Sequence, residues 1–226
     1  MSGHIQDQAV VLQSAAVLLQ YPDAFVYDAL PTVVGALRAL PPGVPVERLL
    51  SLATKLQATP HQEMQEHYVA VLDRKRRCCL YLTWWAHGET RRRGLALARL
   101  KQLYREHGAA LDSTELPDFL PLVLEFAATV DLAAGLAVLQ AHRAGLELLR
   151  LALAELATPY AAALEAVCTL LPGASPRDER EARALAASGP PSELVGLAAP
   201  GGTTGYGAAD PTFDSFIPLD DLGVRR

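Results

Sequence analysis

The sequence predicts an all-α protein, and three observations lead to that prediction. Half of the 226 residues are hydrophobic but only 6% are aromatic, and leucine and alanine, which favour helices over strands, make up the excess. Apolar residues recur at three- and four-residue spacing along most of the chain, which is typical of amphipathic helices. No stretch shows the alternation of a strand or the signal of a hairpin. We therefore expect a single-domain helical bundle over residues 1–171.

The helices are expected to follow one another with short connections. Apolar spacing and proline or glycine punctuation predict them over residues 10–19, 24–40, 45–56, 60–72, 95–107, 131–156 and 159–171. Pro31 is expected to break the second of these. Gly135 and Gly145 are expected to allow close helix contacts within the long helix at 131–156.

The composition changes beyond Pro172. Of the last 55 residues, 7 are proline and 8 are glycine, close to the level of low-complexity or disordered segments. We expect residues 172–226 to form a largely flexible tail, apart from a short helix around 178–187.

The stretch 112–125, which reads D-S-T-E-L-P-D-F-L-P-L-V-L-E, predicts the start of a further helix. Proline is tolerated in a first helical turn, so Pro117 and Pro121 indicate where this helix begins. Glu115 and Asp118 would then lie beside its partially positive end. They form either an acidic first turn with a structural role or part of a binding site.

Composition limits the functional classes. The net charge of −5 argues against nucleic-acid binding as the default. The three cysteines include the adjacent pair Cys78 and Cys79, so a disulfide framework is not expected and a reducing cytoplasm is the natural compartment. We find no secretory signal and no uncharged apolar stretch of membrane-spanning length. The expectation is a cytoplasmic protein that contacts membranes only through a partner.

The motifs of catalysis and metal binding are missing. His61 and His67 are six residues apart, whereas a zincin helix needs histidines at i and i+4. The sequence contains no Walker loop, no G-x-G-x-x-G and no G-x-S-x-G. An enzyme and a bound metal are therefore not expected. An unrecognised active site would have Glu115 and Asp118 as its acids, but no nucleophile or base accompanies them.

Charge is unevenly distributed along the chain. Ten basic and three acidic residues between 73 and 108 give +7, and eight acidic and two basic residues between 109 and 170 give −6. These segments either pair with each other, or the basic one, with Arg74–Arg77 and Arg91–Arg93, attracts an anionic partner. The aromatic residues between the two clusters could stack on nucleic-acid bases, anchor a peptide in a groove, or pack in the core. These residues are Tyr81, Trp84 and Trp85.

Four motifs, in this order and spacing, resemble those of a known family. They are Y-P-D at 21–23, H-Y-V-A-V-L-D-R with R-R-C-C-L-Y-L at 67–82, H-G-E-T-R-R-R-G at 87–94, and E-L-P-D-F-L-P-L-V-L-E-F at 115–126. Over about residues 10–171 the chain resembles the nitrate reductase molybdenum cofactor assembly chaperones. This is the NarJ family, often called the delta subunit, and it is related to TorD-like redox-enzyme maturation chaperones. P-P-S-E-L-V-G-L from Pro190 resembles the end segment of some members.

The resemblance implies a cytoplasmic helical chaperone of the redox-enzyme maturation type that is not a subunit of the finished enzyme. Its partner would be the N-terminal segment of the catalytic (alpha) subunit of nitrate reductase, laid into a groove as a short amphipathic peptide. The chaperone would hold that subunit open for molybdenum bis-guanine-dinucleotide cofactor and iron–sulfur cluster insertion, before membrane docking. The cofactor would be handled by the client, and the chaperone would bind none permanently. Another molybdoenzyme client, and a monomer or a dimer, remain open.

The motifs and the aromatic residues beside them define a candidate partner-peptide site. Its members are Tyr68, Tyr81, Trp84, Trp85, Gly88, Glu89, Arg91, Glu115, Pro117, Asp118 and Phe119. Many members of the family have histidine where this chain has Phe119. That departure argues against a titratable group, and so against a pH-sensitive grip, at this position.

Overall fold

The chain is all-α in the computed structural model, which describes residues 2–111 and 115–188. Within them a single isolated bridge is the only β geometry. The elements are α1 (Ser2–Leu18), α2 (Ala24–Ala39), α3 (Val44–Ala58), α4 (His61–Tyr68), the π-helical turn η1 (Val69–Asp73), the 3₁₀ turn η2 (Arg76–Cys78), α5 (Leu82–His87), α6 (Arg91–Glu106), α7 (Leu120–Thr129), α8 (Leu132–Ala141), α9 (Arg143–Glu155), α10 (Ala161–Thr169) and α11 (Glu179–Ser188). The predicted fold class is confirmed.

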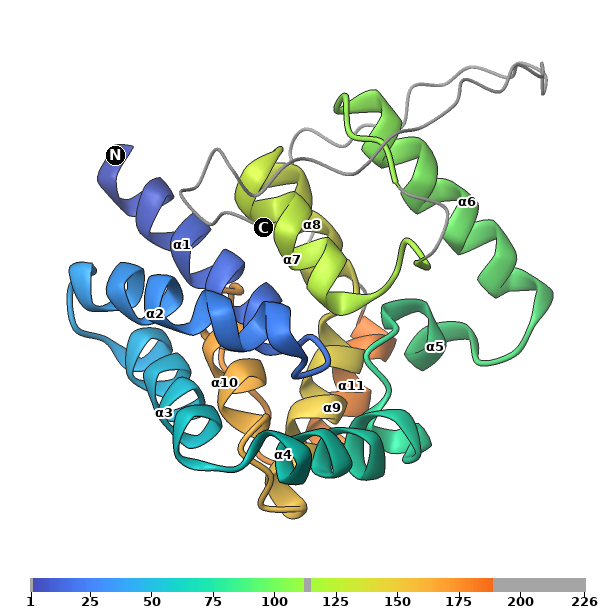
Figure 1. The fold of residues 1–226 in the computed structure, drawn as a ribbon. Helices are drawn as coiled ribbons and strands as arrows, with labels where there is room; N and C mark the ends of the chain where they lie inside the picture. Colours follow the sequence, from blue (N-terminus) through green and yellow to red (C-terminus); the bar gives the residue numbers. More distant parts are fainter. Residues whose placement is uncertain (1, 112–114, 189–226) are drawn as a thin grey trace.

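The core is built around α1. All residues from 11 to 19 are buried, including Leu12, Ala15 and Leu18, which have no exposed surface. A helical segment that is buried on every side needs neighbours on every side, and α1 packs against α2, α3, α7 and α10. Figure 1 shows α1 and α7 side by side in the bundle, with α6 extending away from it.

Pro31 does not break the second helix, contrary to the prediction. α2 continues through it from Ala24 to Ala39. A proline inside a helix costs about 3 kcal/mol. The buried residues Val26, Leu30, Val33 and Leu37 hold the turns on both sides of Pro31, because α2 packs against α1 and α3.

The helix predicted over residues 131–156 is instead two helices, α8 and α9, which meet at His142 with φ −101° and ψ 12°. The close contacts predicted for the two glycines explain why the chain forms two helices here. A Cβ on Gly135 would lie 2.2 Å from Ala127 Cβ of α7, and one on Gly145 would lie 2.6 Å from Trp85 Cβ of α5. The two glycines therefore hold the two helices against different neighbours.

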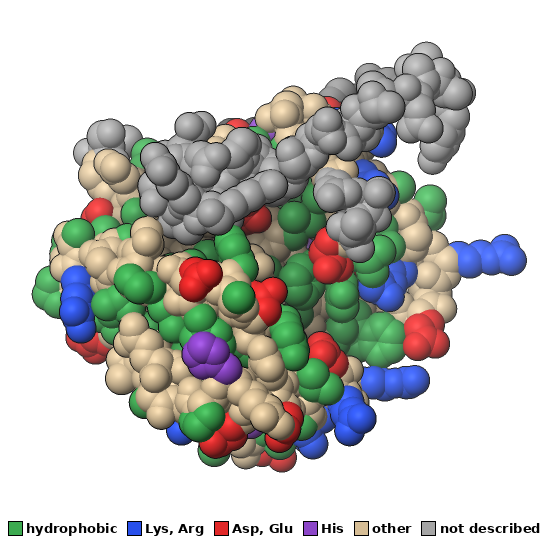
Figure 2. Space-filling view, in the orientation of Figure 1, with side chains coloured by type: hydrophobic (Ala, Val, Ile, Leu, Met, Phe, Trp, Pro, Cys, Tyr) green, Lys and Arg blue, Asp and Glu red, His purple; other side chains and the backbone are tan. Residues whose placement is uncertain are grey.

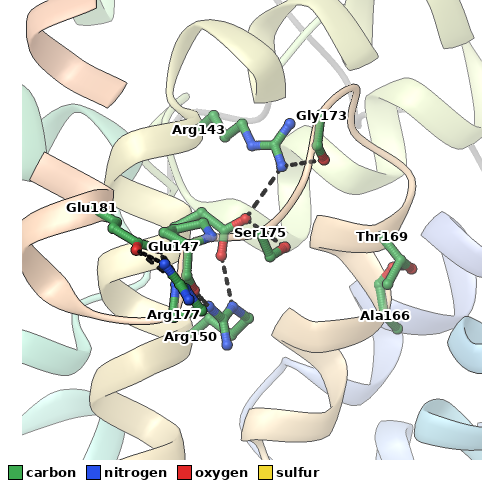
Figure 3. A network of polar contacts seen from close by, with 10 residues as sticks. Arg143, Glu147, Arg150, Ala166, Thr169, Gly173, Ser175, Arg177 and Glu181 are labelled. Atoms are coloured by element: carbon green, nitrogen blue, oxygen red, sulfur yellow. Dashed lines mark hydrogen bonds and ion pairs between the residues drawn. The ribbon is translucent and has the colours of Figure 1, made fainter. Parts of the chain in front are cut away.

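The segment 172–188, which the sequence placed in the tail, packs against the helical body. Its link is a network around Glu147 of α9, whose side chain has no exposed surface (Figure 3). Ser175 Oγ donates to Glu147 Oε1 at 2.8 Å, and Arg143 and Arg150 donate to the carbonyl oxygens of Gly173 at 2.8 Å and Pro176 at 2.6 Å. α11 then lies along α9, with Ala182 buried. The remainder of the predicted tail, 189–226, lies outside the described residues.

Among the described residues, no helix is both long and apolar enough to cross a bilayer.

Replacing Gly135 by alanine is expected to lower the free energy of unfolding by about 1–3 kcal/mol, because the new methyl group would overlap Ala127, including its backbone Cα at 2.4 Å. Gly94→Ala is the matched control. Nothing lies within 4 Å of its Cβ position on α6, so alanine should raise helix stability by up to about 1 kcal/mol. Urea unfolding of both variants checks the difference, and equal stability of Gly135→Ala and the native chain would contradict the packing described.

Candidate functional site

Two segments far apart in the sequence are joined by a short backbone clasp. Leu120 N donates to the Leu80 carbonyl at 2.8 Å, and Leu82 N donates to the Asp118 carbonyl at 2.9 Å. Between these two bonds, Tyr81 and Phe119 form the isolated antiparallel bridge, with ring centroids 5.4 Å apart. We call residues 80–83 and 117–120 the clasp. It brings the C-C-L-Y-L motif against the E-L-P-D-F motif.

Asp118 secures the clasp from the inside. Its side chain is 0% exposed. Its Oδ2 accepts hydrogen bonds from Thr83 N at 3.1 Å and from the Thr83 hydroxyl, and lies 3.7 Å from Arg93 Nη2. Thr83 stands in the first turn of α5, so Asp118 caps α5 and satisfies one of its orphan amides.

This placement corrects one expectation and shows one helix that the sequence did not predict. Sequence reasoning put Asp118 beside the positive end of the helix that follows it, but α7 begins at Leu120, with Pro121 in its first turn. Sequence reasoning also did not foresee α5. The Asp118 carboxylate is turned to α5 and away from solvent, so it positions other residues and does not itself line an open surface.

An open pocket of ≈ 380 Å³ lies beside the clasp, within the size range of small ligand sites. Aromatic side chains and carboxylates dominate its lining, and none of the lining residues is basic. The residues are Gln20, Tyr21, Asp23, Tyr68, Leu72, Asp73, Leu80, Tyr81, Glu115 and Phe119. We call it the acidic aromatic pocket.

The geometry of η1 directs two side chains to this pocket. The π-helical turn at Val69–Asp73 closes with Arg74 N donating to the Val69 carbonyl at 3.0 Å. Such turns often mark functional sites because they re-aim side chains in a helix. Leu72 and Asp73 line the acidic aromatic pocket, whereas Arg74 lines a neighbouring hollow of ≈ 370 Å³.

Three titratable groups of the pocket, Tyr68, Asp73 and Tyr81, sit in partly dehydrated surroundings. Burial raises the pKa of Asp73 above its ordinary value. Burial, assisted by the negative charge of Glu115, raises the pKa of Tyr81 to about 12. The Tyr81 hydroxyl donates to Glu115 Oε1 at 3.2 Å, and the Tyr68 hydroxyl donates to the Leu19 carbonyl at 3.0 Å. Both tyrosines are therefore neutral donors whose rings form the walls.

The structure brings four of the eleven predicted site residues together. Tyr68, Tyr81, Glu115 and Phe119 all line the acidic aromatic pocket. Pro117 and Asp118 are buried behind it, where the Pro117 carbonyl accepts a hydrogen bond from the Tyr104 hydroxyl at 2.7 Å.

The other five predicted residues lie on or just after α5. Trp85 packs on Gly145 and donates from Nε1 to the Cys79 carbonyl at 3.1 Å, so it is partly a packing residue. Trp84 lies under the Arg76 guanidinium at 6.0 Å. Gly88, with a φ of 53°, and the exposed Glu89 lie in the connection to α6, and the exposed Arg91 is the first residue of α6. None of the five lines the pocket.

Sequence reasoning missed part of the lining. Tyr21 and Asp23, from the turn after α1, face Glu115 across the pocket together with Gln20. A signal for them existed, because Y-P-D is one of the four family motifs. The charge pattern offered no such signal, since it singled out basic residues.

The described residues contain no group of three or more histidine, cysteine, aspartate or glutamate side chains placed to hold a metal ion. Cys168 is buried.

The fold resembles that of a solved protein. A crystal structure from Archaeoglobus fulgidus, described as a redox enzyme maturation protein, matches with a TM-score of 0.55 at 19% identity. The match covers 72% of this chain and 92% of that one. The helical body thus has the fold of that protein.

The family follows from the sequence comparisons. A family model described as nitrate reductase delta subunit matches residues 39–166, which include the clasp and most of the pocket. The chain therefore belongs to the nitrate reductase delta subunit family, in agreement with its motifs.

Several relatives of the chain carry descriptive names. The nitrate reductase-like protein NarX of Mycobacterium tuberculosis is 40% identical over 159 residues, which cover 70% of this chain but only 24% of NarX. The nitrate reductase molybdenum cofactor assembly chaperone NarJ of Escherichia coli is 37% identical over 114 residues, covering 49% of this chain and 48% of NarJ. The probable nitrate reductase molybdenum cofactor assembly chaperone NarJ of Bacillus subtilis is 31% identical over 136 residues, covering 60% and 74%.

Asp118→Ala is expected to lower the free energy of unfolding by about 2–4 kcal/mol, because it leaves the buried amide of Thr83 unpaired and Arg93 without its carboxylate. Glu115→Ala, from the same motif but partly exposed, should cost less than about 1 kcal/mol. Denaturant unfolding compares the two. If Asp118→Ala were no more harmful than Glu115→Ala, the capping role assigned to Asp118 would be wrong.

Proposed function

We propose that this chain is a non-catalytic assembly chaperone for respiratory nitrate reductase. It binds the N-terminal segment of the catalytic subunit before that subunit has its cofactor. It keeps the subunit competent for insertion of the molybdenum cofactor and iron–sulfur clusters, ahead of membrane docking. The cofactor belongs to the client in this proposal. The NarJ relatives, which are named as nitrate reductase molybdenum cofactor assembly chaperones, support the assembly role.

One observation supports the proposed site best. The acidic aromatic pocket combines Tyr21, Tyr81 and Phe119 with the carboxylates of Asp73 and Glu115 and contains no basic group. Such a pocket suits a cationic side chain, because the carboxylates attract its charge and the ring faces favour its approach. We therefore propose that the client segment inserts a basic residue here, while the apolar residues beside it contact the aromatic walls. This refines the peptide groove expected from the sequence.

Two alternatives remain distinct from this proposal. A different molybdoenzyme would be recognised through the same pocket, since the fold alone does not select the client. A binder of an anionic partner would use the basic clusters instead, and its affinity would fall steeply with salt. The acidic pocket favours a cationic partner and so argues for the chaperone.

Calorimetric titration with a peptide copying the N-terminus of the catalytic nitrate reductase subunit from the same genome tests the proposal. We expect saturable one-to-one binding. Removing two of the three carboxylate charges of the pocket with Asp73→Asn and Glu115→Gln together should weaken binding by about tenfold, because each lost charge contact contributes up to about 1 kcal/mol. Asp28→Asn is the matched control, since Asp28 is exposed on α2 and lies outside the pocket. An equal loss for Asp28→Asn, or binding unaffected by the double variant, would refute the proposed site.

The affinity for the same peptide should also depend on pH. Since burial raises the pKa of Asp73, this carboxyl takes up a proton at a higher pH than an ordinary aspartate, and with it loses its attraction for a cation. Affinity is therefore expected to fall as the pH falls through this raised pKa. Asp73→Asn should remove that part of the pH dependence, and an unchanged pH profile in this variant would show that Asp73 is not responsible.

A further inference from the structure

α6 presents a basic surface that the proposed function does not use. Leu100 and Tyr104 are buried toward the rest of the molecule, and the remaining sides of the helix reach solvent. We define the α6 basic surface as the exposed residues Arg91, Arg92, Leu95, Arg99 and Lys101. Its four cations have no ion pair or hydrogen bond with other described residues. Figure 2 shows basic side chains projecting from the edge of the molecule where Figure 1 places α6.

The arrangement of this surface suits a ligand that is both anionic and apolar. Arg91, Leu95 and Arg99 follow one another at four-residue spacing and therefore lie along one side of the helix. Leu95 is 58% exposed, one of the most exposed large apolar side chains of the described residues. Arg91 and Arg92 also stand in the first turn, where the helix dipole opposes positive charge. An anion bound there would reduce the repulsion between these arginines and their repulsion by the helix dipole.

The other basic cluster, Arg74–Arg77, is already partly neutralised by nearby carboxylates. Arg77 pairs with Glu155, and Arg76 lies 4.0 Å from Glu89 and over the Trp84 ring. The cluster Arg74–Arg77 also directly follows Asp73, which lines the acidic aromatic pocket. Of the two clusters, α6 therefore carries the stronger attraction for an anionic partner.

The chain itself contains a segment with matching chemistry. Residues 210–222 read D-P-T-F-D-S-F-I-P-L-D-D-L, with four carboxylates and no basic residue. Phe213, Phe216, Ile217 and Leu219 supply apolar groups between these charges. The segment would be repelled by the acidic aromatic pocket and attracted by the α6 basic surface.

The connection is long enough to reach. Residues 189–209 separate α11 from this segment, and 21 residues span up to about 70 Å when extended. A compact body of about 190 residues has a radius of gyration of only about 16 Å. Tethering also gives the segment an effective concentration in the millimolar range, so weak surface contacts suffice.

We propose that residues 210–222 dock on the α6 basic surface of the same chain. The aspartates pair with Arg91, Arg92 and Arg99, and the phenylalanines cover Leu95. The docking site and the client pocket carry opposite charges and involve different elements, so the proposal does not depend on the proposed function.

Zero-length carbodiimide cross-linking of the full chain tests the proposal, because it joins a lysine amine only to a carboxylate in direct contact. The chain has three lysines, Lys55, Lys75 and Lys101, and only Lys101 belongs to α6. We expect peptide mass spectrometry to find the aspartates of 210–222 joined to Lys101, and not to Lys55 or Lys75. Mixing isotope-labelled and unlabelled chains should show that the link forms within one chain.

Neutralising the surface with Arg91→Gln, Arg92→Gln and Arg99→Gln should reduce the Lys101 cross-link by about tenfold. All three arginine side chains are exposed, so their replacement should leave the fold unchanged. Far-UV circular dichroism checks this. Cross-links to Lys75 or Lys55 as frequent as those to Lys101 would overturn the proposal. So would links only between chains, the absence of tail links, or a yield unaffected by the neutralised variant.

Discussion

The buried carboxylate of Asp118 is the interaction on which the candidate site depends. It joins two segments 35 residues apart by accepting from the amide and hydroxyl of Thr83, and Arg93 supplies a nearby positive charge. A carboxylate without exposed surface is tolerated only with such partners. Because these bonds fix the first turn of α5, they also fix the backbone clasp. The clasp in turn sets Tyr81 against Phe119 and places Glu115 at the pocket.

Two surfaces of the molecule carry opposite charge: the acidic aromatic pocket and the α6 basic surface. The pocket collects carboxylates from the turn after α1, from the π-helical turn and from the stretch before α7, whereas α6 collects cations. Part of the basic and acidic segments does pair, as one interpretation of the sequence expected, through Arg77 with Glu155 and Arg93 with Asp118. Among the described residues, α6 has four exposed cations without an ion pair, Arg91, Arg92, Arg99 and Lys101. The two proposed partners, an anionic segment and a cationic side chain, would therefore bind at different places.

Much of the fold could be predicted from the sequence because it follows from local pattern. Apolar spacing located most helices, and Gly135 and Gly145 indicated close packing that the structure confirms. The differences arise from tertiary contacts. α5 has only six residues and is capped from a distant segment, α2 passes through Pro31 because its buried residues hold it, and Glu147 secures residues 173–176 to α9. The pocket was partly predicted, since the predicted site contains Tyr68, Tyr81, Glu115 and Phe119. Y-P-D was among the motifs, but only the fold shows that the turn after α1 lies beside these residues.

The most direct test of the central claim is to locate the client segment by NMR, through contacts between protein ring protons and a bound peptide from the catalytic subunit. If the clasp builds the binding site, peptide contacts should appear at the rings of Tyr21, Tyr81 and Phe119, which line the acidic aromatic pocket. Contacts confined to Trp84 on α5, with the rings of the pocket unaffected, would contradict it.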